Sequence, residues 1–396
     1  MRDIALFGAT GSIGTQTLDL LKYSYQYRLK AVSFNSNYGV LESYLPYFDS
    51  LSDVAIADEG KAEEFQKRHH AYDVHKGRNA SLELFDSLSN DAVVVNSISG
   101  NAGLEVTLEA IKRNHVLLLA NKESLIIGSD LIKEALKTSK SLIYPIDSEH
   151  VALAKLLKEL ELMNIPREKI KKIYVTASGG ALRNMPLDQI GFAGPEDVLA
   201  HPTWHMGDKI TVDCATMVNK AYEVMEASIL FDFPIEKIGA CICQSSLIHA
   251  LIVFENEKGE EEIVYELSPA DMKISIEYAL SLGKTSMHRV NVDEKDKYIL
   301  KDMLKPLDLK RYPLFENTLD MNNKYGNSGM KFYNLLDTVA TDRFLKGLLT
   351  YKGLTSVMKR ADSLYGQYEN EIDSDDAFAL SLCLKETEKE SHCGER

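Results

Sequence analysis

The segment GATGSIG, residues 8–14, constrains the fold of this chain more than any other stretch. It follows the apolar run IALF and precedes TQTLDLL, whose apolar residues have helical spacing. Small residues between a strand and a helix let the backbone approach a pyrophosphate, and the helix adds N–H groups and the positive end of its dipole. The spacing is GxxGxxG rather than the common GxGxxG. The segment favours dinucleotide binding, and a glycine turn that only fits a tight strand–helix link is the alternative.

Strand and helix patterns alternate over the rest of the first third of the chain. The runs LKAVSF, DAVVVN, HVLLLA and SLIYP are separated by helical patterns. This alternation is typical of parallel strands joined by crossover helices. It predicts an α/β fold that opens with a doubly wound, Rossmann-like NADP domain over residues 1–146.

The remaining chain has a different pattern. KIKKIYVTASGG reads as a strand with a glycine turn, residues 210–231 as a helix in their second half, and 240–255 and 261–269 as antiparallel strands. Helical patterns follow at 297–309, 326–350 and 375–390. We therefore predict three further parts, namely an α+β domain at 147–275, a linker at 276–300 and a C-terminal helical domain at 301–396.

Composition excludes several classes of protein. The formal net charge is -14 over 396 residues, which argues against a nucleic-acid binder. No run of 18 apolar residues predicts a membrane span, and no signal peptide is expected before the first strand. The five cysteines form no CxxC pair, so we expect a reducing, cytoplasmic location. Cys241 and Cys243 are interpreted as two residues on one strand face rather than as metal ligands.

The end of the second predicted strand indicates which dinucleotide binds. NAD-selective domains usually place an acidic residue there to hold the ribose 2′-hydroxyl. Here the strand ends in SFNSNYG, so Asn35, Ser36 and Asn37 occupy this place and tolerate a 2′-phosphate. NADP is therefore favoured, and a polar loop without nucleotide contact is the alternative.

An acidic pair follows the last strand of the first domain in the stretch PIDSEH. If this stretch continues the strand, Asp147 and Glu149 point the same way and Ser148 points oppositely, unless the strand end bends. Two carboxylates at a strand's carboxyl end are suited to Mg²⁺ or Mn²⁺.

A third carboxylate is expected from the stretch NKAYE. Glu223 comes four residues after Asn219 and three after Lys220, so these side chains share one helical face. They form either part of a site for a charged, oxygen-rich substrate or a solvated surface ion pair.

Two further segments have polar side chains beside turn residues. Ser178, in TASGG, is placed to donate to a phosphate. The segment HPTWHMGDK contains His201 and the single tryptophan, Trp204. An aromatic residue in such a turn-rich segment suggests a lid that excludes water, and a packed surface loop is the alternative.

Together these motifs resemble one enzyme family, the 1-deoxy-D-xylulose 5-phosphate reductoisomerases. The resemblance rests on GATGSIG, SGNAGL, LANKES, PIDSEH, TASGG, HPTWHMGDKITVDCATMVNKAYEVMEA and SPADMK, in the family's order over about residues 1 to 275. It implies a homodimer that binds a small phosphorylated substrate, NADPH and Mg²⁺ or Mn²⁺, and no nucleic acid or membrane. It further implies that residues 147–275 form the catalytic, connecting and dimerisation domain. It also implies conversion of 1-deoxy-D-xylulose 5-phosphate to 2-C-methyl-D-erythritol 4-phosphate, by retroaldol–aldol rearrangement and reduction, in non-mevalonate isoprenoid biosynthesis.

The resemblance also implies a role for each matching residue. The metal ligands would be Asp147, Glu149 and Glu223, which with Lys122 and Lys220 form the catalytic set. The substrate contacts would come from Lys122, Ser148, Glu149, Ser178, His201, Cys214, Asn219, Lys220 and Glu223. The cofactor contacts would come from Thr10, Gly11, Ser12, Ile13, Asn37, Asn121, Glu123 and Gly207. Asn35 and Ser36 are further candidate cofactor contacts, from their place at the end of the second predicted strand. The lid would include Trp204 and Met206.

The chain departs from the family pattern at four places. Cys214 stands where a phosphate-binding serine is usual, and Cys243 interrupts a stretch that usually reads His-Pro-Gln-Ser. Asn35 and Ser36 replace a common glycine and a common basic residue, and GNSGMKFYN replaces an asparagine- and alanine-rich segment.

Two other classes of function stay open, namely a metal-independent NADP-dependent semialdehyde or polyol dehydrogenase and a non-catalytic NADP-binding regulator.

Overall fold

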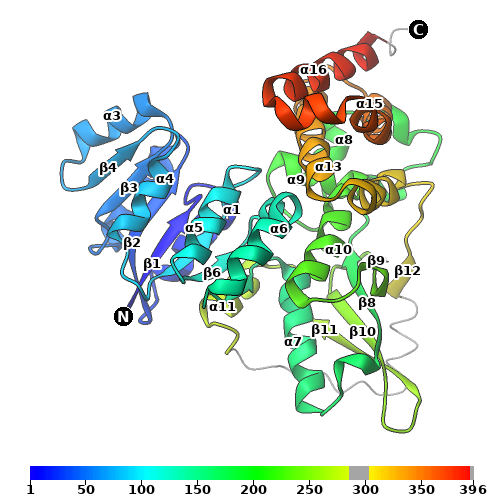
Figure 1. The fold of residues 1–396 in the computed structure, drawn as a ribbon, viewed down its shortest axis with the longest axis horizontal. Helices are drawn as coiled ribbons and strands as arrows, with labels where there is room; N and C mark the ends of the chain where they lie inside the picture. The colour runs from blue at the N-terminus through cyan, green and yellow to red at the C-terminus, as the bar shows by residue number, and fades with distance from the viewer. Residues whose placement is uncertain (285–302, 393–396) are drawn as a thin grey trace. The chain divides into compact units, whose positions relative to one another are not determined.

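The computed structural model describes residues 1–284 and 303–392, in two compact units (Figure 1). The first unit comprises residues 1–151 and 271–288, and the second residues 152–270 and 289–396, as far as they are described. The linker expected at 276–300 lies outside the described residues from 285 onward, as does the end of the chain from 393.

A seven-stranded parallel sheet forms the centre of the first unit, with the strand order β4-β3-β2-β1-β5-β6-β7. Its strands are β1 (Arg2–Phe7), β2 (Tyr27–Phe34), β3 (Asp53–Ile56), β4 (Asp73–Lys76), β5 (Val93–Asn96), β6 (Val116–Leu119) and β7 (Ile143–Pro145). The helices of this unit are α1 (Ser12–Leu21), α2 (Tyr38–Glu42), α3 (Glu59–Arg68), α4 (Ala80–Glu83), α5 (Gly103–Lys112), α6 (Lys122–Thr138) and α11 (Met272–Leu280). The predicted doubly wound fold is confirmed.

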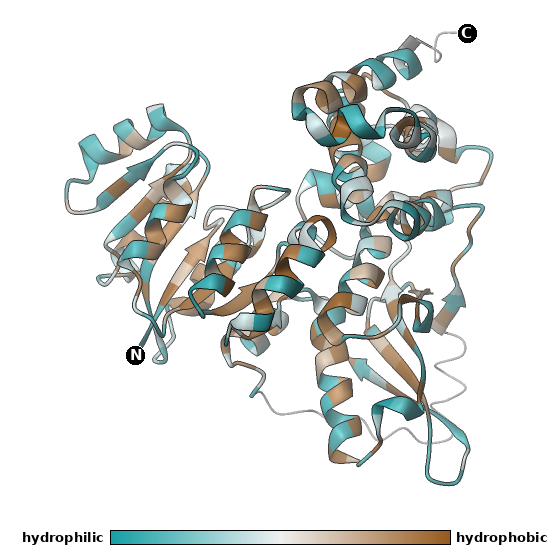
Figure 2. Cartoon of the chain, viewed as in Figure 1, coloured by the Kyte–Doolittle hydropathy of each residue, from teal (hydrophilic) through white to brown (hydrophobic). Residues whose placement is uncertain are grey.

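Both faces of the sheet are covered at its central strands β1, β5 and β6, which is why these strands are apolar without alternation. Ile4 and Leu6 of β1 belong to a core shared with α1 and α11. Phe7 points the opposite way and stacks on Phe85, with ring centroids 5.1 Å apart. The hydrophobic colour of the central strands in Figure 2 follows from this burial on both sides.

The second unit contains a mixed sheet with the strand order β11-β10-β8-β9-β12. Its strands are β8 (Ile170–Ala177), β9 (Ile238–Cys243), β10 (Ile248–Glu255), β11 (Glu261–Leu267) and β12 (Leu304–Pro306). The predicted β10–β11 hairpin is confirmed, whereas residues 240–255 form two strands rather than one. Cys241 and Cys243 both lie on β9, as expected.

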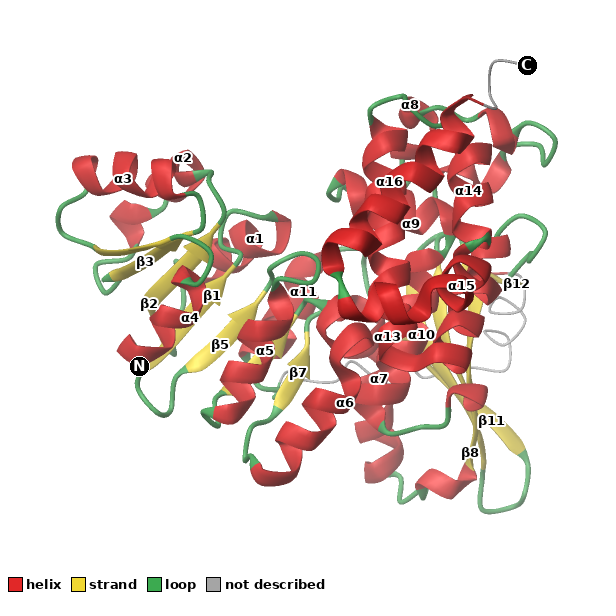
Figure 3. Ribbon diagram, turned by 45° about the horizontal axis from the view of Figure 1, so that its top comes forward, coloured by secondary structure: helices red, strands yellow, loops and turns green. Residues whose placement is uncertain are grey.

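Helices pack on this sheet and continue to the C-terminus (Figure 3). They are α7 (Ser148–Leu162), α8 (Pro195–Leu199), α9 (Asp208–Thr216), α10 (Val218–Phe231), α13 (Pro313–Leu345), α14 (Tyr351–Lys359), α15 (Ala361–Ser374) and α16 (Asp376–His392). The boundary between the two units falls inside α7. Among the described residues, none of the helices combines the length and apolarity that a membrane crossing needs.

Two further secondary-structure predictions in the second unit were wrong. Residues 210–216, expected outside a helix, belong to α9, which a left-handed Met217 (φ 67°) separates from α10. Residues 304–306, expected within a helix, form β12, which pairs with β9 at the sheet edge. Pro306 is compatible with this edge position, but it would remove a hydrogen bond inside a helix.

Candidate functional site

The glycine turn between β1 and α1 requires glycine at two positions. Gly8 has a φ of +85°, and a Cβ there would lie 2.5 Å from the carbonyl oxygen of Ser97. A Cβ on Gly14 would lie 2.2 Å from the Gly8 oxygen, so α1 could not pack this closely against the turn. The first turn of α1 contains no acidic side chain to oppose an anion. The turn therefore has the geometry and the charge of a phosphate-binding helix start.

Two groups of the expected cofactor residues lie at the carboxyl ends of the neighbouring strands β1 and β2. Thr10 and Gly11 are in the turn after β1, and Ser12 and Ile13 begin α1. The segment 35–37 follows β2, the direct neighbour of β1, with Asn35 and Asn37 exposed and Ser36 half-buried. The structure thus places both groups at the carboxyl ends of the parallel strands, on the same side of the sheet.

Asn121 and Glu123 hold a neighbouring turn in place. The Asn121 side chain accepts from the backbone N–H of Ser124 and donates to the Gly100 carbonyl, 2.9 Å away. Glu123 accepts from the Gly100 N–H at 3.0 Å. These contacts fix the loop that follows β5. Because β5 is the direct neighbour of β1, this loop lies beside the glycine turn that follows β1.

The strand argument for the acidic pair was wrong. β7 ends at Pro145 and α7 begins at Ser148, so Asp147 precedes a helix and Glu149 lies in its first turn. The bend that Ser148 required is this start of a helix, and its hydroxyl donates to the Glu149 carboxylate.

Asp147 is held in its ionised form. Its carboxylate lies 2.7 Å from Lys122 Nζ and 3.6 Å from His150 Nδ1. Burial alone would raise the pKa of Asp147, but Lys122 and His150 outweigh burial and hold this pKa well below its ordinary value. An ionised carboxylate at this position is what a cation requires.

The second unit contains a buried polar group on α10. The Asn219 amide and the Lys220 ammonium each donate to the Glu223 carboxylate. Glu223 is 2% exposed and Lys220 4% exposed, so the alternative of a solvated surface pair is wrong. The predicted shared helical face is confirmed.

Ser178 and His201 form a second polar pair in this unit. Ser178 Oγ lies 3.0 Å from His201 Nε2 and accepts from the Gly180 N–H at 3.1 Å. His201 Nδ1 accepts from the backbone N–H groups of Thr203 and Trp204, at 3.2 and 2.9 Å. Nδ1 therefore has no proton, and Nε2–H donates to Ser178. Burial, with the positive Arg183 and His205 nearby, lowers the pKa of His201 to about 4.

The segment expected as a lid lies outside helices and strands up to Gly207, which precedes α9. The Trp204 ring meets the His249 ring of β10 edge-on, at 6.1 Å between centroids. Trp204 and Met206 are both half-buried, and Cys214 lies half-buried on α9.

The motifs did not identify the residues that hold the Ser178 turn. Arg183 donates to the Ser178 carbonyl, and Tyr312 donates to the Gly179 carbonyl. The only signal for Arg183 was its position shortly after two glycines, and Tyr312 lies more than a hundred residues further along the chain.

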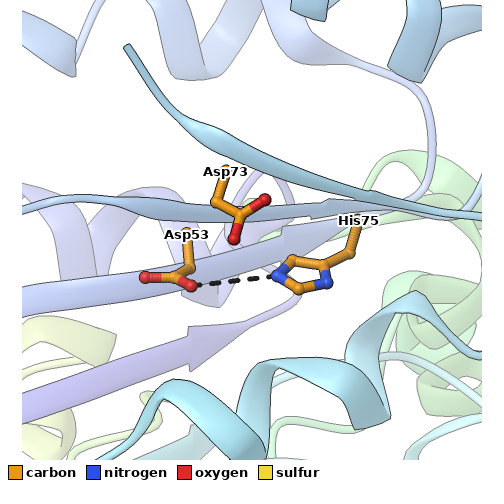
Figure 4. Close-up of side chains that lie close together, drawn as sticks. All are labelled: Asp53, Asp73 and His75. Atoms are coloured by element: carbon orange, nitrogen blue, oxygen red, sulfur yellow. Dashed lines mark ion pairs between the residues drawn. The ribbon is translucent and has the colours of Figure 1, made fainter.

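A separate group of possible metal ligands lies in the first unit (Figure 4). His75 Nε2 of β4 is 3.8 Å from Asp53 of β3, and Asp73 lies beside them. Lys30 already pairs with Asp53 at 3.4 Å, and Glu83 pairs with His75 at 3.0 Å. Asp53 and Asp73 are the first residues of their strands. The group therefore lies at the amino ends of the strands, whereas the glycine turn lies at the carboxyl ends. We interpret it as an ion-pair network that joins two short strands.

The doubly wound sheet with its glycine turn, and the buried polar groups of the second unit, define an α/β protein of the dinucleotide-binding enzyme class. Three family models match the chain. The model described as 1-deoxy-D-xylulose 5-phosphate reductoisomerase matches residues 4–129, and the models of two C-terminal domains of that enzyme match residues 143–231 and 267–384.

Curated relatives and solved structures agree with these matches. The 1-deoxy-D-xylulose 5-phosphate reductoisomerase of Thermotoga maritima is 36% identical over 98% of this chain and 96% of its own. The Bacillus subtilis enzyme is 32% identical over 91% of this chain and 92% of its own. A reductoisomerase crystal structure with NADPH, fosmidomycin and magnesium has a TM-score of 0.79, at 26% identity over 99% of this chain and 97% of its own. The Zymomonas mobilis enzyme with NADPH has a TM-score of 0.77, at 25% identity over 98% of this chain and 99% of its own. This chain belongs to the 1-deoxy-D-xylulose 5-phosphate reductoisomerase family.

Proposed function

We propose that this chain is an NADPH- and divalent-metal-dependent enzyme that converts 1-deoxy-D-xylulose 5-phosphate to 2-C-methyl-D-erythritol 4-phosphate, a step of non-mevalonate isoprenoid biosynthesis. The observation that carries the proposal is the buried Glu223 carboxylate with Asn219 and Lys220 on it. A charged cluster this deeply buried is costly to fold, so a functional role explains it better than a structural one.

The metal would be held by Asp147, Glu149 and Glu223. All three offer carboxylate oxygens, the ligand type that Mg²⁺ and Mn²⁺ prefer, so the donor set fits. When bound, the metal supplies Lewis-acid stabilisation of oxyanion charge, and NADPH supplies the hydride. Lys122 places further positive charge beside Asp147, and Lys220 places it beside Glu223.

The substrate phosphate would be held by Ser178, His201, Asn219 and Cys214. Ser178 Oγ accepts one hydrogen bond from Gly180 and one from His201, so its own hydrogen points to a third group. A phosphate oxygen is an acceptor that fits this donor. Because His201 is neutral, it orients the serine without competing as a cation.

NADPH would bind at the glycine turn of the first unit, with the helix start of α1 on its pyrophosphate. The cofactor residues are those expected from the sequence, including the neutral segment 35–37 and Gly207. Trp204 and Met206 would close over the bound substrate and exclude water during reduction.

The domain boundaries 1–146, 147–275, 276–300 and 301–396 are retained as a functional division. We also propose a homodimer and a cytoplasmic location, supported by family membership and by the absence of a CxxC pair. Light scattering on the purified protein tests the homodimer. We expect a molar mass twice that of one chain, which is 44.4 kDa.

The test of the activity is NADPH absorbance with 1-deoxy-D-xylulose 5-phosphate, before and after treatment with EDTA. We expect oxidation that EDTA abolishes and that added Mg²⁺ or Mn²⁺ restores. Oxidation that persists in EDTA would favour a metal-independent dehydrogenase. Nucleotide binding without oxidation would favour a regulator.

A further inference from the structure

One arginine joins the ends of two strands beside the Ser178–His201 pair. Arg183 Nη1 donates to the Ser178 carbonyl and to the Gln244 carbonyl, each at 2.9 Å. Ser178 follows β8, and Gln244 follows its parallel neighbour β9. Both carbonyls lie beyond Ala177↔Ile242, the last pair of the ladder, so strand pairing does not hold them together.

The turn after Ser178 is confined on its other sides as well. Tyr312, which is 3% exposed, donates to the Gly179 carbonyl at 2.7 Å. Gly180 has a φ of +66°, and a Cβ there would lie 2.9 Å from the Cys214 carbonyl oxygen on α9. Gly179 and Gly180 are therefore fixed by these contacts, whereas the Ser178 carbonyl that precedes them is held by Arg183.

The direction of the Ser178 hydroxyl depends on this turn. Its Oγ is fixed by the Gly180 N–H and by His201 Nε2, and both contacts require the present backbone path. Charge-assisted bonds from a guanidinium to carbonyls are stronger than neutral ones, so Arg183 is the strongest single restraint on this path.

We propose that Arg183 is a positioning residue for substrate phosphate, because it ties Ser178 to Gln244 and so sets the direction of the Ser178 hydroxyl. The proposal rests on the proposed function, in which Ser178 binds phosphate. It assigns Arg183 no direct contact with the substrate. Removing it should weaken phosphate binding more than the chemical step.

The test compares Arg183→Met, which keeps the length but removes charge and donors, with Arg183→Lys, which keeps the charge. Arg167→Met is the matched control, since Arg167 also donates to two backbone carbonyls in this unit, those of Phe231 and Asp232. The measured quantities are the KM for 1-deoxy-D-xylulose 5-phosphate, the KM for NADPH, kcat, and the Kd of inorganic phosphate by calorimetry.

For Arg183→Met we expect the substrate KM and the phosphate Kd to rise together by about 10- to 100-fold. The KM for NADPH should not change, and kcat should fall by less than the substrate KM rises. Arg183→Lys should show a smaller rise, and it keeps the test valid if the methionine variant does not fold. Arg167→Met should change none of these values.

An unchanged substrate KM and phosphate Kd in both Arg183 variants would overturn the proposal. So would an equal rise in the KM values of substrate and NADPH, because a general loss of structure would produce it. Absence of turnover by the unmodified enzyme would count against the proposed function instead, and the phosphate Kd would still test Arg183.

Discussion

Lys220 and Glu223 lie three residues apart on α10 and form an ion pair in which both side chains are almost completely buried. A buried charge needs a partner, and removing one member of such a pair leaves the other uncompensated. The pair therefore gives each of the two buried charges a partner inside the second unit. In our proposal the Glu223 carboxylate is a metal ligand.

Replacing Glu223 by Gln keeps the size of the side chain but removes its charge. We expect kcat/KM for 1-deoxy-D-xylulose 5-phosphate to fall at least about 100-fold. Mutation of a residue that only hydrogen-bonds to a metal ligand already lowers metal affinity or activity by about 10- to 100-fold, and loss of a ligand should cost more. NADPH binding, measured by fluorescence titration, should stay close to that of the unmodified chain.

The control is Glu161→Gln, which breaks the exposed ion pair with Lys158. It should leave both quantities unchanged. Full metal-dependent activity in Glu223→Gln would show that this residue is not a metal ligand.

His201 makes stability depend on pH in a defined window. Its pKa is lowered to about 4 by burial and by the positive Arg183 and His205, against about 6.5 for an unfolded histidine. Between these values the unfolded chain binds more protons at this site, so stability rises with pH up to about 6.5 and then levels off.

Urea unfolding of the unmodified chain and of His201→Gln isolates this effect. The difference between their free energies of unfolding should grow in favour of histidine from about pH 4 to 6.5 and stay constant above. A difference that is constant over the whole range would mean that His201 is not held neutral in the folded chain.

Cys214 lies on α9 where a serine is usual in the family, and its carbonyl packs against the Ser178 turn. A thiol is a weak donor, and a hydroxyl donates a stronger bond to phosphate. We expect Cys214→Ser to lower the substrate KM by about 2- to 10-fold. An unchanged or raised KM in steady-state assays would exclude Cys214 as a phosphate contact.

Lys209 of α9 joins two carboxylates, Asp213 on its own helix and Asp337 on α13. Burial would lower the pKa of Lys209, but these carboxylates raise it above its ordinary value. Asp337 is 1% exposed, whereas about a third of the Lys209 side-chain surface remains accessible. Asp337→Asn should therefore reduce the free energy of unfolding by about 1–3 kcal/mol.

The matched control on α13 is Asp342→Asn, which removes an exposed pair with Lys346 at 2.7 Å. It should cost less than about 1 kcal/mol in the same denaturant experiment. Equal losses in the two variants would contradict a structural role for the Lys209 network.

The elements that the sequence predicts well are those with a local cause. The parallel fold of the first unit could be predicted because its central strands are continuous apolar runs. β3 and β4 gave no such signal, since each has four residues and DVHK of β4 is polar. The helix α9 was missed because Ile210, Thr211 and Val212 are β-branched, and packing of α9 against α8, α10 and α13 overrides that preference.

The candidate site divides in the same way. The contacts of Asn219 and Lys220 with Glu223 follow from helical spacing, so the sequence predicts them. The alternation argument failed for Asp147 and Glu149, because the chain changes from strand to helix between them. The contacts of Arg183 and Tyr312 with the Ser178 turn depend on tertiary packing, and no local pattern predicts them.

The central claim is tested most directly by product analysis in a single reaction. The chain is incubated with 1-deoxy-D-xylulose 5-phosphate, NADPH and Mg²⁺. The phosphorylated products are identified by NMR spectroscopy, which distinguishes the branched carbon skeleton from its linear isomer, while NADPH is followed by absorbance. Our account predicts one 2-C-methyl-D-erythritol 4-phosphate for each NADPH oxidised. NADPH oxidation that yields a reduced but unrearranged sugar phosphate would contradict it.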